Sequence, residues 1–377
     1  MTPLNRACVA IRSMSAMAIG AMNRSYLAPG LVAIVMLGDA LPATDTRPFA
    51  VPHRFDPVDA ATIQIAAGAV HPTGLPVLAQ PPGLDDAPSL ASAAVRWRTS
   101  AYTIRTLTPK ERFELRDGSV TTAWPPTRIH DRYGVPMRII DGQRRYHPLG
   151  LVRLGLKYLS RYRLTGDPLF LDRAKRIAAG LQRMAVRTPN AVWFPYRFKW
   201  PGNQPPWYSG YAQGFALSFF VRLWEVTEAE RYRVLANLTY NSLRTLRRAS
   251  APWVTWVDGN RYLWIDEYPQ QLDRTFNGHV FALVGLHDYY EMTKRTDLYS
   301  AARNANVLAV LRGGITAIRA YASTFRNPGG VSDYCLADHV RNRHYHPVHV
   351  MQLRYLAVMT GDPWFERMAD HFFADFH

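Results

Sequence analysis

The stretch Thr165-Gly-Asp-Pro-Leu-Phe170 returns almost unchanged near the C-terminus as Thr360-Gly-Asp-Pro-Trp-Phe365. Two weaker copies lie between them. All four have an apolar or aromatic residue five positions after a Thr and an Ala nine positions after it. The four Thr residues are 62, 66 and 67 residues apart. A fixed period of this size is typical of proteins built from repeated structural units.

Each repeat predicts a helical hairpin. The first helix is apolar and carries glycines, which are poor helix formers and therefore indicate close packing between helices. In the Thr-Gly-Asp-Pro turn, the Asp can cap the second helix and the Pro suits its first position. We therefore expect eight main helices between Pro148 and Phe376. The expected second helices, which are mostly rich in Arg, are Leu169–Arg183, Glu228–Arg248, Asp297–Arg312 and Pro363–Phe376.

The predicted fold class is mainly α: an α/α toroid of four helical hairpins, or incomplete α/α barrel, with the first helices inside and the second outside. An open solenoid of the same hairpins is the alternative. In a toroid the inner helices run parallel, so their N-termini share one end with the connections that enter them. These connections are long, at about 186–206, 250–275 and 313–343. Long connections in compact domains usually carry function.

Titratable side chains gather at this end. Glu267 and Tyr268 lie in the second connection, Tyr334 lies in the third, and Tyr345 begins the last inner helix. One such Tyr is usually structural, but several at one end of a toroid indicate an active site. The helix N-termini there would also favour an anionic ligand.

Further polar and aromatic residues near the helix starts are candidates for binding substrate, because sugar rings stack on aromatic side chains. The alternative is that they are ordinary core residues. The spacing of His346 and His349 would allow a metal site, but no third ligand is evident, so we predict neither a metal nor a cofactor. The substrate-binding candidates are Tyr146, His147, Trp207, Tyr208, Gln213, Asn277, His346, His349 and Gln352.

The N-terminal part divides into three predicted segments. Residues 1–43 are typical of a signal peptide or membrane anchor, because an apolar run, Tyr26–Leu37, is followed by small residues. Residues 44–95 are rich in Pro, Ala and Gly and are expected to be a poorly ordered linker. Residues 96–145 are expected to form a small β-rich cap, ahead of an α/α-barrel catalytic domain at 146–377. The expected strands are Tyr102–Ile104, Ser119–Thr122 and Met137–Ile140.

The charge of the chain indicates its kind of partner. The 377 residues carry a formal net charge of +16, and the 45 basic residues include only five lysines. Arg suits carboxylate and sulfate groups, so we expect an acidic polysaccharide as partner, although an Arg-biased genome would give the same composition. Dispersed basic residues without a binding motif disfavour nucleic acid. We expect export to the periplasm or cell envelope. Membrane association through the N-terminus and a homodimer remain open, and the two cysteines do not settle the compartment.

Four motifs together resemble the C-terminal domain of the D-glucuronyl C5-epimerases. They are Tyr146-His147-Pro148, Trp207-Tyr208-Ser209-x-x-Ala212-Gln213-Gly214, Glu267-Tyr268-Pro269 followed by Asn277-Gly278, and Tyr345-His346-x-x-His349-x-x-Gln352-Leu353. The resemblance covers roughly residue 146 to the C-terminus. The joint order of the four motifs is specific, whereas each motif alone is weak.

The resemblance implies an α/α-barrel enzyme that converts D-glucuronate to L-iduronate within heparan-type polysaccharides. It places the catalytic Glu-Tyr pair of the family on Glu267 and Tyr268, and another catalytic Tyr on Tyr345. The remaining catalytic Tyr, in a Tyr-Asp-Leu-Arg context in the family, corresponds to Tyr334. The Arg of that context is Ala337 here, and the N-terminal β domains of the family are missing or much reduced.

Inversion at C5 needs two proton-transfer groups on opposite faces of the sugar and neutralisation of the carboxylate charge. Tyr268 and either Tyr345 or Tyr334 are expected to exchange the protons, with Glu267 in support. Which Tyr serves which face is open. A polysaccharide lyase would remove the same proton and then expel the C4 substituent, and a non-catalytic envelope protein that binds anionic polysaccharide would need neither phenol.

Overall fold

The computed structural model describes residues 96–115, 122–249 and 252–377. The predicted signal peptide and linker lie outside these residues. Within them the chain is mainly α-helical, with eight helices and three short β-hairpins. The helices are α2 (Pro148–Thr165), α3 (Pro168–Met184), α4 (Gly210–Thr227), α5 (Glu230–Leu243), α6 (Phe276–Thr293), α7 (Ala301–Phe325), α8 (His346–Thr360) and α9 (Pro363–Asp375). The antiparallel hairpins pair β1 (Arg138–Ile140) with β2 (Gln143–Arg145), β3 (Val186–Thr188) with β4 (Ala191–Trp193), and β5 (Thr255–Val257) with β6 (Leu263–Ile265).

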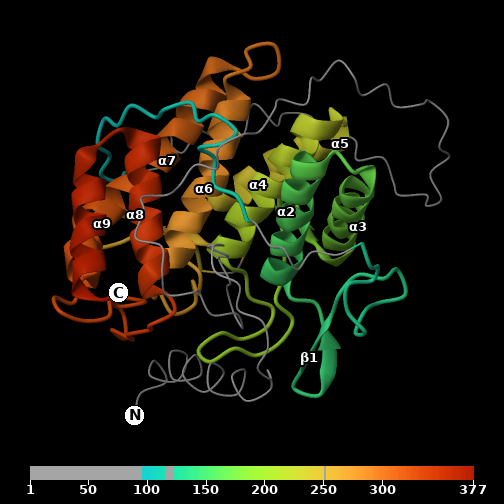
Figure 1. Ribbon diagram of the computed structural model, residues 1–377, viewed down its shortest axis with the longest axis horizontal. Helices are drawn as coiled ribbons and strands as arrows, with labels where there is room; N and C mark the ends of the chain where they lie inside the picture. The colour runs from blue at the N-terminus through green and yellow to red at the C-terminus, as the bar shows by residue number, and fades with distance from the viewer. Residues whose placement is uncertain (1–95, 116–121, 250–251) are drawn as a thin grey trace.

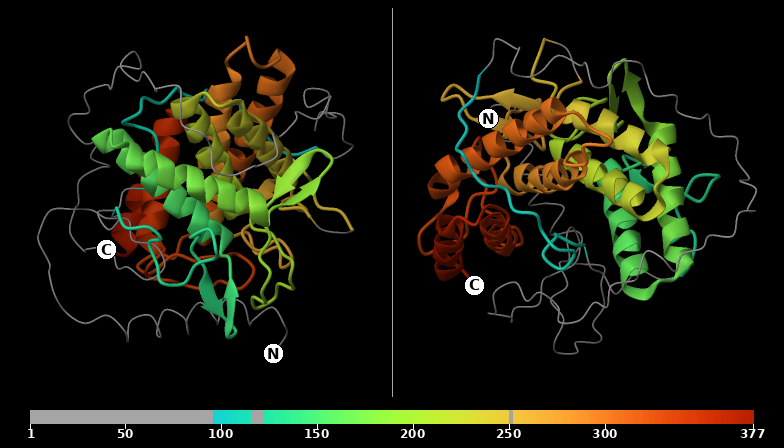
Figure 2. Two further views of the ribbon diagram at one scale, coloured as in Figure 1. Left: turned by 90° about the vertical axis from the view of Figure 1, so that its right-hand side faces the viewer. Right: turned by 90° about the horizontal axis from the view of Figure 1, so that it is seen from above.

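The eight helices form four successive hairpins, as the repeat predicts (Figure 1). The inner helices pack in the order α2, α4, α6, α8, and the outer helices α3, α5, α7 and α9 each pack against the inner helix that precedes them. Seen from above, the hairpins follow one another around an arc (Figure 2). The fold is therefore the expected α/α toroid.

Local sequence explains where these helices begin and how closely they pack. Asp167 and Asp362 cap α3 and α9 with their side chains, each directly before a Pro at the first helical position. Gly214 and Gly285 meet where α4 crosses α6, and a Cβ atom on Gly285 would overlap the backbone of Gly214. Repeated glycines on the inner helices therefore serve close packing, as the sequence indicates.

Two predicted outer helices end elsewhere. The second was expected to continue to Arg248, but α5 ends at Leu243. The third was expected to stop at Arg312, but α7 continues through Gly313 and Gly314 to Phe325. A Cβ atom on Gly313 would collide with Trp97, and one on Gly314 with Leu283. The two glycines accommodate these neighbours and do not end the helix, so the third connection is shorter than predicted.

The strand expected at Tyr102–Ile104 does not form, and the strand at Ser119–Thr122 lies mostly outside the described residues. Only the expectation at Met137–Ile140 is met, by β1. Instead of a sheet, the chain before the hairpin enters the centre of the toroid. The ring of Phe113 lies 5.3–6.0 Å from rings on α4, α6 and α8. Glu114 accepts hydrogen bonds from Ser160 and Arg163 of α2. This segment therefore contacts all four inner helices. The C-terminal ends of these helices are at the top of Figure 1.

The opposite, lower end in Figure 1 collects the N-termini of the inner helices and the three connections that enter them. The first two connections contain the hairpins β3–β4 and β5–β6. The second and third are joined by a bridge between Thr275 and Cys335. No helix among the described residues is long and apolar enough to cross a membrane.

Candidate active site

The centre of the candidate site is the carboxyl group of Glu267, two residues after β6. Glu267 is 6% exposed, and the Tyr334 hydroxyl donates a hydrogen bond of 3.0 Å to its Oε2 atom. A Cβ atom on Gly278, in the first turn of α6, would lie only 2.6 Å from the same oxygen. Glycine at position 278 therefore lets the carboxyl group lie against the start of α6.

Tyr334 is held in place by the main chain of the third connection. Its carbonyl accepts a hydrogen bond of 3.1 Å from the N–H of Phe276, the first residue of α6, and its own N–H donates to Val340. The first N–H groups of a helix have no partner within the helix, so this contact also satisfies one end of α6. Backbone hydrogen bonds thus bring Tyr334 next to Glu267, although the two residues lie far apart in the sequence.

Two more phenols complete the cluster. Tyr345 is the residue before α8, and its ring centroid lies 4.6 Å from that of Tyr334. The hydroxyl of Tyr334 also has hydrogen-bonding interactions with the hydroxyls of Tyr268 and Tyr345. Tyr268 and Tyr334 are buried, whereas Tyr345 is half-buried. The structure therefore brings together all four residues that the sequence proposed as catalytic, and Tyr345 is the most accessible of them.

Burial determines the protonation of this cluster. It raises the pKa of Glu267 to about 7, even though hydrogen bonds from Tyr334 and Tyr268 lower it. It also raises the pKa of Tyr268, Tyr334 and Tyr345, and the negative charge of Glu267 adds to the effect. The phenols therefore hold their protons at neutral pH, and Glu267 is the group placed to exchange one there.

Aromatic rings line the cluster on the side of the first connection. Trp200 lies parallel to Tyr268 with 6.2 Å between centroids, and Trp207 lies 5.9 Å from the same ring. Trp207 stacks on Tyr196 at 3.9 Å, and the ring of His147 meets Tyr196 edge-on at 5.3 Å. Of the predicted binding residues, Trp207 and His147 thus belong to the wall of the site.

Sequence reasoning missed four residues here: Tyr196, Tyr211, Arg138 and Arg153. The Tyr211 hydroxyl is buried and has no hydrogen-bond partner among the described residues. Burial raises its pKa well above the ordinary value, while Arg153 lowers it and Glu267 and Tyr345 raise it. Tyr211 therefore lies within electrostatic reach of the cluster. The sequence feature that could have identified Tyr211 is its position in the first turn of an inner helix, four residues after Trp207.

The two arginines supply positive charge next to the phenols. Arg153 lies on α2 and is 8% exposed. Arg138, at the start of β1, has its Nη2 atom 3.7 Å from the position that a Cβ atom on Gly150 would occupy. Burial, followed by the charges of Arg138 and Arg153, lowers the pKa of His147 to about 3. His147 is therefore neutral, and its Nδ1 accepts the Gly150 N–H to cap α2.

Three predicted binding residues point elsewhere. The Tyr146 hydroxyl donates a hydrogen bond of 2.6 Å to Asp131, away from the cluster. Tyr208 packs edge-on against Trp193 with 5.5 Å between centroids. Both amide atoms of Gln213 are used within the protein, by Phe194, Val192 and Ser242. The inner helix α4 is buried nearly all round, so sequence periodicity could not show which of its residues face the site.

The four remaining candidates stand around the starts of α6 and α8. His346 accepts the Ser332 N–H at Nδ1, and its Nε2 contacts the Phe372 carbonyl at 2.7 Å, so it pins the third connection to α9. His349 contacts the Ser332 hydroxyl at 2.9 Å. Gln352 donates to the carbonyl of Asn277, whose own side-chain amide is buried without a partner among the described residues. The histidines thus stabilise the scaffold, whereas Asn277 has free hydrogen-bonding capacity.

A second acid, Asp273, lies near the cluster. It is 1% exposed, and neither carboxyl oxygen has a hydrogen-bond partner among the described residues. Burial raises its pKa to about 9, and the nearby acids Asp266, Asp338 and Glu267 contribute. Asp273 is therefore protonated at neutral pH. The described residues contain no group of three His, Cys, Asp or Glu side chains arranged to hold a metal ion.

Comparison with known proteins finds one family that matches the C-terminal part of the chain. Residues 189–373 match the family described as "D-glucuronyl C5-epimerase C-terminus". An uncharacterized protein of Methanocaldococcus jannaschii is 25% identical over 175 residues, which are 45% of this chain and 53% of that protein. The chain therefore spans about half the length of the curated relative it matches.

Two solved structures are similar at a low level. A D-mannose isomerase matches with a TM-score of 0.43 and 12% identity, over 61% of this chain and 58% of that one. The cellobiose 2-epimerase from Spirochaeta thermophila matches with a TM-score of 0.40 and 12% identity, over 62% of this chain and 59% of that one.

Proposed function

We propose that the chain is a carbohydrate epimerase acting on a uronate, because residues 189–373 match the D-glucuronyl C5-epimerase C-terminal family. The reaction proposed is inversion of C5 in D-glucuronate residues of an acidic polysaccharide, which gives L-iduronate. One observation carries the proposal: a buried carboxyl group and three phenols, contributed by the second and third connections, form one hydrogen-bonded cluster at the N-terminal end of the inner helices.

The first step breaks the C5–H bond. A phenol oxygen of the cluster takes the C5 proton while its own proton passes to the carboxylate of Glu267, and the bonding electrons remain on the sugar as a carbanion beside the carboxylate. Tyr334 suits this role because it already donates its proton to Glu267. The relay removes the difficulty that a phenol of raised pKa is a poor base, because the proton finally rests on a carboxyl group with a pKa of about 7.

The second step forms a new C5–H bond on the opposite face. Tyr268 or Tyr345 donates its hydroxyl proton to the carbanion and becomes a phenolate. Both hydroxyls interact with Tyr334, so the proton held on Glu267 can return through Tyr334 and restore the phenol. No net proton is consumed. Single Tyr→Phe variants at 268 and 345 assign the second face, because only one of them should abolish return of the proton.

Charge neutralisation of the substrate carboxylate falls to Arg153 and Arg138 in this proposal. The position that carries an Arg in the related motif is Ala337 here. Arg153 acts electrostatically on both Tyr211 and Tyr345, and Arg138 acts on Tyr196. A guanidinium group binds a carboxylate through two parallel hydrogen bonds and stabilises charge that develops next to it. These arginines would therefore supply from α2 and β1 the positive charge that is missing at position 337.

The test is incubation with glucuronate-containing polysaccharides in deuterated water. We expect deuterium at C5 and the appearance of iduronate, followed by NMR. A lyase would instead produce an unsaturated uronate that absorbs in the ultraviolet, and that product would replace the epimerase proposal. A protein that binds the polymer without exchange at C5 would be the non-catalytic binding protein.

We also propose export, because the apolar run Tyr26–Leu37 is followed by small residues. Mass spectrometry of the native protein should find the chain cleaved near Ala43 or retained at a membrane. An intact N-terminus in the cytoplasmic fraction would contradict it.

A further inference from the structure

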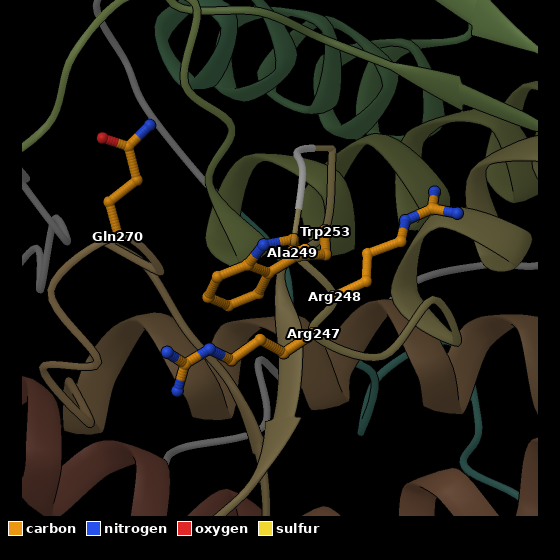
Figure 3. Close-up of a pocket in the computed structure, with 5 residues that line it drawn as sticks. All are labelled: Arg247, Arg248, Ala249, Trp253 and Gln270. Atoms are coloured by element: carbon orange, nitrogen blue, oxygen red, sulfur yellow. The ribbon is translucent and has the colours of Figure 1, made fainter.

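A surface hollow of about 630 Å³ lies beside the second connection, lined by Arg247, Arg248, Ala249, Trp253 and Gln270. In Figure 3, the indole of Trp253 lies between the side chains of Arg247 and Gln270, and Arg248 extends to the other side. The guanidinium carbon of Arg247 is 5.7 Å from the centroid of the Trp253 ring. The volume falls within the range of about 300–1,000 Å³ that is usual for ligand sites.

The hollow lies close to the phenol cluster along the chain. Gln270 follows Tyr268 by two residues, and the N–H of Gln271 donates to the Tyr268 carbonyl at 3.0 Å. Gln270 also exchanges hydrogen bonds of 2.8 and 3.2 Å with Gln204 of the first connection, the same connection that holds Trp200 against Tyr268. A ligand in the hollow would therefore contact the segment that positions a proposed catalytic phenol.

The lining is cationic and aromatic. Arg247 and Arg248 are exposed, and among the described residues no acidic side chain pairs with either of them. The backbone N–H of Arg247 donates to the Thr255 carbonyl at 2.7 Å, and Arg248 donates to the Pro252 carbonyl at 3.4 Å. The Arg247 guanidinium thus lies against a half-exposed indole, and the Arg248 guanidinium is held by a carbonyl next to Trp253 in the chain. This combination can stack a sugar ring and bind its anionic substituent at the same time.

We propose that this hollow is a second sugar subsite, which binds an anionic residue of the polysaccharide whose glucuronate reacts at Glu267. The inference rests on the proposed function for the existence of a reacting residue. The indole of Trp253 takes the face of the sugar, and Arg247 and Arg248 take its carboxylate or sulfate. A polymer held in this way is anchored at a point outside the proton-transfer cluster, so the subsite contributes to binding and leaves the chemical step unchanged.

The test compares Arg247→Gln/Arg248→Gln and Trp253→Ala with Arg319→Gln. Arg319 is a matched control, because its guanidinium lies 3.7 Å from the ring of Trp364 near the start of α9, outside the hollow. Each variant is titrated by calorimetry with a glucuronate–glucosamine polysaccharide, with the same polymer after reduction of its carboxyl groups, and with dextran sulfate. C5 deuterium uptake is measured in parallel on the unmodified polymer and on a disaccharide.

We expect the double variant to bind the unmodified polymer about tenfold more weakly, which corresponds to the loss of one to two charge-assisted contacts, with kcat and uptake on the disaccharide unchanged. Wild-type protein should bind the reduced polymer at least as weakly as the double variant binds the unmodified one, because reduction also removes the carboxylate assigned to Arg153. Retained affinity of the double variant for dextran sulfate, with loss for the uronate polymer, would assign the hollow to carboxylate, whereas loss for dextran sulfate alone would assign it to sulfate. Equal polymer affinity in wild type and double variant overturns the subsite. Absence of C5 exchange in the wild type overturns the proposed function, and the binding titrations still decide whether the hollow binds anionic sugar.

Discussion

Two buried acids stand at the two ends of the toroid and differ in the partners they have. Asp288, near the C-terminal end of α6, accepts hydrogen bonds from Arg112, Arg222 and Ser218 at 2.6–3.1 Å. Glu267, at the opposite end, is hydrogen-bonded by hydroxyl groups alone among the residues that the structure describes, with Tyr334 at 3.0 Å. Burial would raise the pKa of both. The two guanidinium groups hold the pKa of Asp288 below its ordinary value, whereas the pKa of Glu267 rises to about 7.

This difference distinguishes a structural site, at Asp288, from the proposed catalytic site, at Glu267, within the same fold. Arg112 belongs to the extended segment that enters the toroid, so the ion pair with Asp288 fastens that segment to α6. A carboxylate that is fully paired resists protonation and contributes to stability. A buried carboxyl group that is paired only with phenols can gain and lose a proton near neutral pH. The buried acid that is paired with arginines therefore lies at the end of the toroid where no chemistry is proposed.

The largest expected effect is a loss of stability when Asp288, the acid paired with arginines, is replaced. Asp288→Asn should lower the free energy of unfolding by about 3–5 kcal/mol, because it leaves Arg112 and Arg222 as buried charges without their partner. Urea denaturation measures this. Glu267→Gln is the matched variant at the other end and should unfold within about 1 kcal/mol of the wild type at pH 8. Equal losses in the two variants would show that both acids are structural.

The next effect concerns the positive charge of the site. Arg153→Gln should lower kcat/KM for C5 exchange roughly 10- to 100-fold, because the carbanion would lose a charge-assisted contact. Arg153→Lys should recover part of the loss, since it restores the charge without the bidentate geometry. Melting temperatures of both variants serve as the control. Wild-type exchange in Arg153→Gln would remove this residue from carboxylate binding.

The pH dependence of kcat/KM tests whether Glu267 exchanges a proton during the reaction. If ionised Glu267 is the final proton acceptor, kcat/KM should fall about tenfold per pH unit below its pKa of about 7 and level off above it. In Glu267→Gln the residual rate should lose this dependence. A profile that stays flat from pH 5 to pH 8 in the wild type would place the essential acid elsewhere.

The last expected effect concerns the stability of the protein and not its activity, and it involves Asp273. Burial raises its folded pKa to about 9 from an ordinary 3.8, so the folded state binds a proton that the unfolded state has released. Stability should therefore fall as the pH rises from about 4 towards 9. Asp273→Asn should be more stable than the wild type at pH 8 and should flatten the decline between pH 5 and pH 8 in thermal melts. A variant that is less stable than the wild type at pH 8 would indicate that Asp273 has a partner when ionised.

The sequence predicts most of the fold and the core of the site for an identifiable reason. A repeat of Thr, apolar residue and Ala defines the hairpins, and parallel inner helices necessarily bring their starts together. Glu267, Tyr334 and Tyr345 could therefore be grouped without knowledge of any contact. Their grouping depends on the order and direction of the helices, which the sequence repeat predicts.

The parts that could not be predicted depend on side-chain direction and on long-range packing. Tyr211 lies within electrostatic reach of the cluster, but α4 is buried on nearly all sides and gives no amphipathic pattern that would single this residue out. Gly313-Gly314 has the composition of a helix end, yet Trp97, more than two hundred residues earlier, occupies the space above it. Arg153 lies within an otherwise apolar helical run, where sequence alone favours no partner.

The rate of deuterium uptake at C5 in Tyr334→Phe, measured against Tyr208→Phe on the same uronate polymer, tests the proton-transfer role of the cluster most directly. Both phenols are buried, but only Tyr334 is bonded to Glu267. We expect Tyr334→Phe to lose about 100- to 10,000-fold in exchange and Tyr208→Phe to keep the wild-type rate, with both melting within a few degrees of the wild type. Exchange at the wild-type rate in a folded Tyr334→Phe variant would contradict the role of the cluster.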